Sequence, residues 1–79
     1  MTSTLQMLVR DADGALVRVL GLSERRGYRT LGVRAEADPE QSWLQLLLCV
    51  EAKRPVEQLV RQLNKLVDVR DVEVCHDNV

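Results

Sequence analysis

Residues 11–16, with the sequence DADGAL, have the types and spacing that could bind a small charged molecule. An alternating apolar segment precedes them and a helically periodic segment follows, so they lead from a strand into a helix. Free backbone N–H groups and the helix dipole attract an anion there, and Gly14 leaves room for a carboxylate to approach. Asp11 could hold an ammonium group, so the turn would suit a free amino acid. Asp-Gly before a helix is also common turn chemistry, and this alternative stays open.

The cysteines and the single histidine could form a disulfide or bind a metal, but their positions argue against both. Cys75, His76 and Asp77 are adjacent, and neighbours on a strand point to opposite faces, so Cys75 and His76 cannot readily share one ion. The sequence has no second cluster to complete four ligands. Cys49 and Cys75 fall in strands that we expect two spacings apart, about 9.6 Å, beyond the ~7 Å reach of a disulfide. We therefore predict buried or half-buried free thiols and no metal site.

No arrangement of residues is typical of a catalytic site. His76 has no Ser or Cys partner in a suitable context for nucleophilic catalysis. The carboxylate pairs, Asp11 with Asp13 and Glu36 with Asp38, fall in turns and loops, where solvated side chains are the usual case. We predict that the chain is not an enzyme and holds no cofactor.

Length and composition indicate one small domain, residues 1–79, that needs a partner. A chain below ~80 residues has a marginal core, and association with another chain is a common supplement. The net charge of −1 gives no strong field for nucleic acid or membranes, and only Tyr28 and Trp43 could stack on bases. No apolar run approaches the ~20 residues that span a bilayer. Without a visible secretory signal, we expect a cytoplasmic protein with reduced thiols.

Periodicity divides the chain into four strands and two helices that would position these residues. Apolar residues recur at steps of three and four in the helices, most regularly from Val56 to Val67. Asp13 can accept hydrogen bonds from the first turn of the first helix, and Gly27 can adopt the left-handed conformation that ends it. Gly32 indicates a bulge or a close backbone approach. The predicted strands cover residues 4–10, 28–37, 43–51 and 69–75, with a hairpin loop at 37–42 and helices that follow Asp13 and Pro55.

The order of elements predicts an α+β fold with a ferredoxin-like βαββαβ arrangement. Two split βαβ units with right-handed crossovers give a four-stranded antiparallel sheet in the order 4-1-3-2, with both helices on one face. Val72 and Val74 would then face the core from the last strand. The other face stays uncovered. Alternate residues of the third strand form two sets, both largely apolar, and one set must lie on this face. An uncovered apolar face is an association surface. One of these sets is Trp43, Gln45, Leu47 and Cys49.

Two segments make the chain recognisable. GALVRVLGLSERRGY at 14–28 and QLNKLVDVRDVEV at 62–74 resemble the ACT domain of the small regulatory subunit of acetohydroxyacid synthase, also called acetolactate synthase. The chain looks like the short, isozyme II type of this family. The resemblance implies a non-catalytic cytoplasmic subunit that docks on the catalytic large subunit and activates it in branched-chain amino acid biosynthesis. It also implies that thiamine diphosphate, Mg²⁺ and FAD belong to that large subunit and not to this chain.

The resemblance also implies an effector site. Valine-sensitive members have an Asn in the loop after the first strand, a Gly in that loop and an Asn just after the Gly-Tyr pair. This chain keeps Gly14 but has Asp11 and Arg29 at the Asn positions, which implies a valine-insensitive subunit with a reshaped or abandoned site. Alternatively, Asp11 and Arg29 pair across a subunit contact. The effector-binding residues implied by the resemblance are Asp11, Gly14, Ala15, Leu16, Arg29 and Thr30.

Three hypotheses for the function compete. In the favoured one, the domain forms a homodimer through sheet edges or the uncovered face, and the dimer docks on the catalytic subunit and favours its active arrangement. The exposed side of the first helix, with Arg18, Glu24 and Arg25, is one candidate contact, although such charged faces are usually only solvated. The second hypothesis is a stand-alone amino-acid sensor of the same fold. The third, a ferredoxin-like metal carrier, needs paired cysteines in the first loop, which has none.

Overall fold

The computed structural model describes residues 1–38, 40 and 42–78, and their side chains as far as residue 75. Its elements are β1 (Thr2–Arg10), α1 (Ala15–Arg25), β2 (Arg29–Ala37), β3 (Trp43–Glu51), α2 (Val56–Leu63) and β4 (Val69–Asn78). The strands form one antiparallel sheet in the order β2-β3-β1-β4, which is the predicted order 4-1-3-2 seen from the other edge. The predicted hairpin loop at 37–42 includes residues 39 and 41, which lie outside the described residues.

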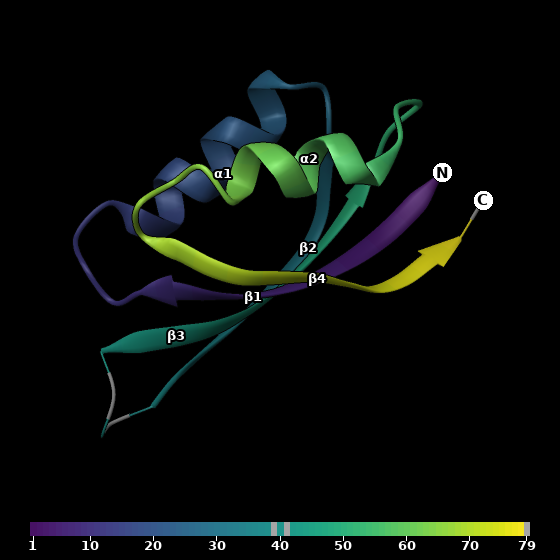
Figure 1. Cartoon of the computed structure of the whole chain (residues 1–79). Helices are drawn as coiled ribbons and strands as arrows, with labels where there is room; N and C mark the ends of the chain where they lie inside the picture. The colour runs from purple at the N-terminus through teal and green to yellow at the C-terminus, as the bar shows by residue number, and fades with distance from the viewer. Residues whose placement is uncertain (39, 41, 79) are drawn as a thin grey trace.

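Both helices pack on one face of the sheet, as predicted, and the chain ends lie side by side (Figure 1). The ends meet because β1 and β4 are antiparallel neighbours, with Thr2 opposite Asn78. The core lies between the helical layer and the sheet, where each fully buried aliphatic side chain contributes roughly 1.5–3 kcal/mol. Its buried members are Leu5, Met7, Val9, Ala15, Val19, Tyr28, Leu46, Leu48, Val50, Val56, Leu59, Leu63 and Val69.

The two ends of α1 are set by glycines in the left-handed conformation. At the end of the helix Gly27 has φ 88°, and its N–H donates to the Glu24 carbonyl at 3.0 Å, as predicted. At the start the prediction for Asp13 is wrong. The N-cap residue is Gly14, with φ 81°, and no side chain caps the helix. The N-cap position has a left-handed backbone, which a glycine adopts at little cost and an aspartate does not.

Helix α2 is shorter than its apolar periodicity predicts, because it ends at Leu63. Beyond it, Lys65 N–H donates to the Gln62 carbonyl at 3.2 Å and Leu66 N–H donates to the Leu63 carbonyl at 3.0 Å. These bonds span three residues and tighten the chain so that it can turn back to the sheet. Leu66 still packs against the core, but Val67 is 86% exposed.

Irregular pairing changes the two edge strands. β4 extends to Asn78, beyond the predicted end at residue 75, and its pairing with β1 shifts register twice. One shift lies beside Asp71, which has φ 57°. Val72 packs against the core as predicted, whereas Val74, which lies at the other register shift, is 40% exposed. In β2 a register shift between Thr30 and Gly32 confirms the bulge that the glycine indicated.

The uncovered face is the side of the sheet away from the helices. From β3 it receives Trp43, Gln45, Leu47, Cys49 and Glu51, since the alternate residues are buried or face the helices. This confirms one of the two predicted sets. The face is nevertheless less apolar than predicted, because the neighbouring strands place charged side chains beside this set. Arg10 lies opposite Trp43, and Arg34 lies opposite Leu47.

Candidate functional site

The helix-start loop, residues 11–16, forms the predicted corner between β1 and α1. It is attached to the start of β3, since the backbone N–H of Asp11 donates to the Ser42 carbonyl at 2.7 Å. The positive φ of Gly14 turns the chain directly into the helix. Four of the predicted effector residues lie here: Asp11 and Gly14, both exposed, Leu16, half-buried, and Ala15, buried.

An arginine lies across this loop. Arg18, from the first turn of α1, reaches back so that a Cβ added at Gly14 would lie 3.1 Å from its Nη1 atom. The same guanidinium pairs with the carboxylate of Asp68, which lies just before β4. Asp68 also pairs with Arg10 Nε at 3.3 Å. Arg18 therefore joins the helix-start loop to the β4 side of the molecule, a role that its position on the outer side of a helix does not reveal.

The other two predicted effector residues lie at the opposite end of the sheet. Arg29 and Thr30 begin β2, and Arg29 pairs with Glu51 at the end of β3. Arg10, just before the helix-start loop, pairs with Trp43 at the beginning of β3. Eight residue steps along a strand separate these positions by roughly 26 Å. One chain therefore does not bring the six predicted residues together.

At that far end, Arg29 and Thr30 have partners of their own. Arg29 Nη1 lies 3.8 Å from Glu51 Oε1, and the backbone N–H of Thr30 donates to Glu24 Oε1 at 3.2 Å. The Thr30 hydroxyl is buried and has no hydrogen-bond partner among the described residues. The alternative in which Asp11 pairs with Arg29 is thus not met within one chain and requires a second copy.

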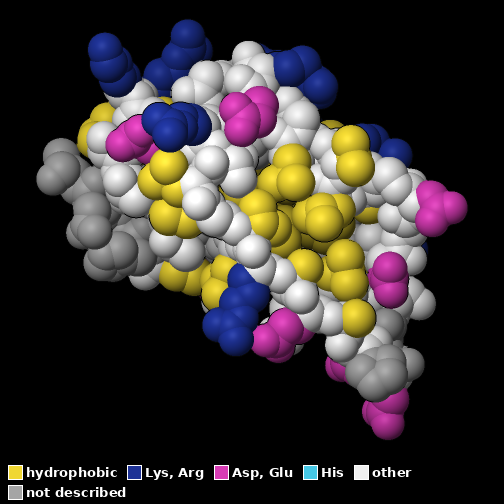
Figure 2. Space-filling view, turned by 180° about the vertical axis from the view of Figure 1, so that it is seen from behind, with side chains coloured by type: hydrophobic (Ala, Val, Ile, Leu, Met, Phe, Trp, Pro, Cys, Tyr) yellow, Lys and Arg dark blue, Asp and Glu magenta, His cyan; other side chains and the backbone are white. Residues whose placement is uncertain are grey.

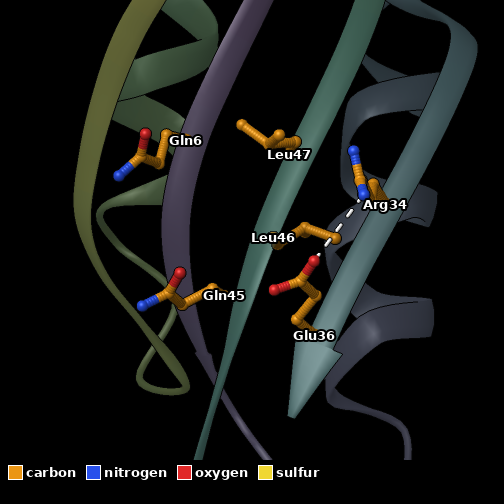
Figure 3. A pocket seen from close by; sticks show the side chains of 6 residues that line it. All are labelled: Gln6, Arg34, Glu36, Gln45, Leu46 and Leu47. Carbon is orange, nitrogen blue, oxygen red and sulfur yellow. Dashed lines mark ion pairs between the residues drawn. The ribbon is translucent and has the colours of Figure 1, made fainter. Parts of the chain in front are cut away.

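A shallow hollow of about 250 Å³ lies on the uncovered face (Figure 3). Figure 3 shows Gln6 from β1 and Gln45 from β3 on one side of it, and Arg34 and Glu36 from β2 on the other. Arg34 Nε and Glu36 Oε1 form an ion pair at 3.7 Å. Small-molecule sites are concave and enclose most of their ligand. This open hollow does not meet that description.

Sequence alone missed a cluster on the same face. The arginine–tryptophan cluster consists of Arg10 from β1, Trp43 from β3 and Arg70 from β4. The guanidinium carbons of Arg10 and Arg70 lie 4.9 and 4.1 Å from the centroid of the Trp43 ring. Strand alternation could have placed Arg10 and Trp43 on one face. Only the register of β4, where Arg70 lies opposite Leu8, shows that the second arginine joins them.

Cys49 and Cys75 are free thiols, as predicted. Cys49 is half-buried, but Cys75 is exposed on the edge strand β4, where its Sγ atom lies 3.4 Å from Gln6 Oε1. Among the described residues, no three His, Cys, Asp or Glu side chains gather as a metal site requires. The side chains of His76 and Asp77, which the metal hypothesis needed, lie outside those residues. Within the same part of the chain, neither helix has the length and apolar character to cross a bilayer.

A comparison with known protein families identifies the family of this chain. Residues 11–72 match the family model of the ACT domain. The chain belongs to the ACT domain family. The matched segment of this ACT domain begins at the helix-start loop, contains both helices and ends within β4.

Curated proteins similar to this ACT domain are named acetolactate synthase small subunits. The protein from Mycolicibacterium smegmatis is 41% identical over 98% of this chain and 46% of its own length. The protein from Buchnera aphidicola subsp. Schizaphis graminum is 37% identical over 87% of this chain and 44% of its own length. A probable acetolactate synthase small subunit from Archaeoglobus fulgidus is 33% identical over 100% of this chain and 51% of its own length. The chain spans about half the length of these relatives.

A solved structure agrees with these relatives. The crystal structure of the acetolactate synthase small subunit from Thermotoga maritima superimposes on this ACT domain with a TM-score of 0.81 and 25% sequence identity. The superposition covers 94% of this chain and 47% of that chain. The ferredoxin-like fold and the resemblance that the segments at 14–28 and 62–74 indicated are therefore confirmed.

Proposed function

We propose that this ACT domain is a non-catalytic regulatory subunit of acetolactate synthase, which binds the catalytic large subunit and activates it in branched-chain amino acid biosynthesis. The observation that carries this proposal is the 41% identity, over 98% of the chain, to a protein named acetolactate synthase small subunit. Thiamine diphosphate, Mg²⁺ and FAD would belong to the large subunit. The two free thiols suit a reducing compartment such as the cytoplasm.

An activator without catalytic groups acts through its contacts alone. It must bind the active arrangement of the catalytic subunit more tightly than the inactive one. A tenfold shift of that equilibrium requires about 1.4 kcal/mol of differential binding. One or two additional hydrogen bonds in the active arrangement would supply this free energy.

A homodimer through the free edge of β2 is part of the proposal. β2 is an edge strand, and its residues Leu31 and Val33 are 47% and 42% exposed. On the side of the molecule where β2 lies, hydrophobic side chains gather among charged ones (Figure 2). An edge strand presents unpaired N–H and C=O groups to another chain. Pairing with a second copy would extend the sheet and cover these apolar side chains.

Such a dimer would also bring the separated effector residues together. Antiparallel pairing of two β2 strands sets the start of one strand beside the end of the other. The end of β2, at Ala37, lies opposite Leu44, at the same end of the sheet as the helix-start loop. The second copy would thus supply Arg29 and Thr30 near that loop, and the subunit contact is where Asp11 and Arg29 could pair.

Insensitivity to valine is the most specific part of the proposal. The exposed Asp11 carboxylate would repel the carboxylate of an amino acid that approached the helix-start loop. We expect calorimetric titration of the chain with valine, leucine or isoleucine to show no saturable binding. Saturable micromolar binding in the absence of any synthase would instead favour the stand-alone amino-acid sensor.

Sedimentation velocity tests the partnership directly. The purified chain, mixed with the isolated catalytic subunit at micromolar concentration, should sediment with it as one complex. A ferredoxin-like domain of the same size from an unrelated protein is the control and should sediment alone. A chain that stays separate from the catalytic subunit at saturating concentration would contradict the proposed function.

A further inference from the structure

We propose that the arginine–tryptophan cluster binds an acidic segment of the catalytic subunit, which makes the uncovered face the docking surface for that subunit. This inference rests on the proposed function and adds to it the surface and the chemistry of the contact. The cluster places two partly exposed guanidinium groups and an aromatic ring at one place on the sheet.

The two cations are held in position before any partner arrives. The guanidinium groups of Arg10 and Arg70 lie over the Trp43 ring, an arrangement that cation–π attraction stabilises. Asp68 fixes Arg10 further, because its carboxylate pairs with Arg10 Nε at 3.3 Å and its carbonyl accepts the Arg10 backbone N–H at 2.7 Å. Side chains that are already ordered lose less conformational entropy when they bind.

Both guanidinium groups remain accessible to a partner. The side chains of Arg10 and Arg70 are 47% and 53% exposed. Arg70 Nε lies 3.9 Å from Asp71 Oδ2, which is too long for a hydrogen bond. Asp71 is itself 69% exposed, so this pair is weak and an incoming carboxylate can displace it. A guanidinium group binds a carboxylate through two parallel hydrogen bonds, which favours an acidic partner.

Apolar neighbours extend the contact area. Leu8 lies opposite Arg70 and is half-buried, and Leu47 on β3 is 37% exposed. Tryptophan and arginine are among the residue types enriched at the positions that dominate binding energy at protein interfaces. The surface therefore fits a peptide segment that carries a carboxylate beside an apolar side chain.

A second copy of this chain is the wrong occupant for the cluster. A twofold dimer contact buries the same surface of both subunits. Centred on this cluster, it would set Arg10 and Arg70 of one copy against the same arginines of the other, and like charges repel. The β2 edge lies two strands away from β1 and serves a second copy better.

Charge reversal at Arg70 tests the docking surface. Arg70→Glu should weaken the affinity of the chain for the isolated catalytic subunit by about 30-fold, the loss typical of an interface hot spot. Arg61→Glu is the matched control, because Arg61 is exposed on α2, in the layer opposite the uncovered face. Its affinity should stay within about threefold of the unsubstituted chain. Circular dichroism establishes folding, and Arg70→Gln replaces the Glu variant if the latter unfolds.

The single tryptophan of the chain gives a second readout. The chain labelled with 5-fluorotryptophan reports on Trp43 alone by ¹⁹F NMR while the catalytic subunit stays unlabelled. Addition of the catalytic subunit should change the chemical shift of this signal, whereas broadening alone follows from the slower tumbling of any complex. Higher salt should weaken the binding, since charge attraction between exposed groups is screened.

Three outcomes would overturn the inference, and each is distinguishable. If the catalytic subunit binds but the chemical shift of the ¹⁹F signal and the affinity of Arg70→Glu are unchanged, docking uses another surface and the proposed function stands. If the chemical shift of the ¹⁹F signal, and not only its width, changes with the concentration of the chain alone, a second copy occupies the cluster. If the unsubstituted chain does not bind the catalytic subunit, the proposed function fails together with the inference.

Discussion

At the residue scale, Tyr28 joins the end of α1 to the start of α2. Its ring is 2% exposed, and its hydroxyl donates to the Pro55 carbonyl at 2.7 Å. Burial raises the pKa of Tyr28 above its ordinary value, although the nearby Arg54 partly opposes this. The folded state therefore holds the neutral phenol more firmly than the unfolded chain does.

Tyr28→Phe should lower the free energy of unfolding by about 1 kcal/mol, because it removes one hydrogen bond and keeps the ring. The pH dependence of stability should also change. A raised folded-state pKa adds stability that is complete below the unfolded pKa of about 10 and is lost as pH rises through the folded pKa. The original chain should therefore lose more stability than the Phe variant as the pH rises above about 10. Urea unfolding across that range measures this, and equal losses would contradict it.

The end of α1 was predictable because its conformational demand is local: Gly27 takes the left-handed backbone there, as predicted. At the start of the helix the predicted Asp13 cap was wrong, and Gly14 takes the N-cap position. The contacts of Arg18 were not predictable, since its partner Asp68 lies 50 residues along the chain. Arg70 was missed for the same reason, because its place beside Trp43 depends on how β4 and β3 each pair with β1.

At the element scale, local periodicity located the helices and strands but not all their ends. The apolar steps continue from Val56 to Val67, yet α2 stops at Leu63 because the chain must turn back to reach β4. The irregular pairing of β4, with Asp71 at φ 57°, is likewise a property of its contact with β1. Such tertiary demands leave no mark on the periodicity of a single segment.

Two glycine substitutions in and beside α1 should have opposite effects. Gly14→Ala should lower the free energy of unfolding by about 1 kcal/mol, because a side chain is strained at φ 81°. Gly21→Ala, within the helix, should raise it by roughly 0.5–1 kcal/mol, since alanine favours the helical backbone. The new Cβ would lie 3.1 Å from Arg25 Nη1, the flexible end of a side chain that can move away. Thermal unfolding of both variants gives the signs, and matching signs would be incompatible with the observed backbone of α1.

The edge strand β2 should govern self-association. Val33→Lys should weaken the proposed homodimer by about tenfold or more, because it removes apolar contact and charges the edge. Val67→Lys is the matched control, since Val67 is 86% exposed in the turn after α2 and far less suited to pairing. Sedimentation equilibrium of the two variants measures the dissociation constants. Equal self-association of Val33→Lys and the unsubstituted chain would place the dimer contact elsewhere.

At the scale of the whole molecule, one chain provides two separated halves of the predicted effector site. The helix-start loop lies at one end of the sheet, and Arg29 with Thr30 lies at the other. Sequence could indicate the loop, because strand, turn and helix signals are contiguous there. It could not show the separation, which depends on the direction and register of β2 against β3. This geometry makes association with other chains necessary for a site that uses both halves.

The most direct test of this regulatory role is the rate of acetolactate formation by isolated catalytic subunit, titrated with the purified chain. We predict a rate that rises with the concentration of the chain, saturates, and does not fall when valine is added. The Arg61→Glu variant should saturate at the same rate and a similar concentration. A rate that stays at the level of the catalytic subunit alone, at concentrations where the chain is folded and in excess, would contradict the account.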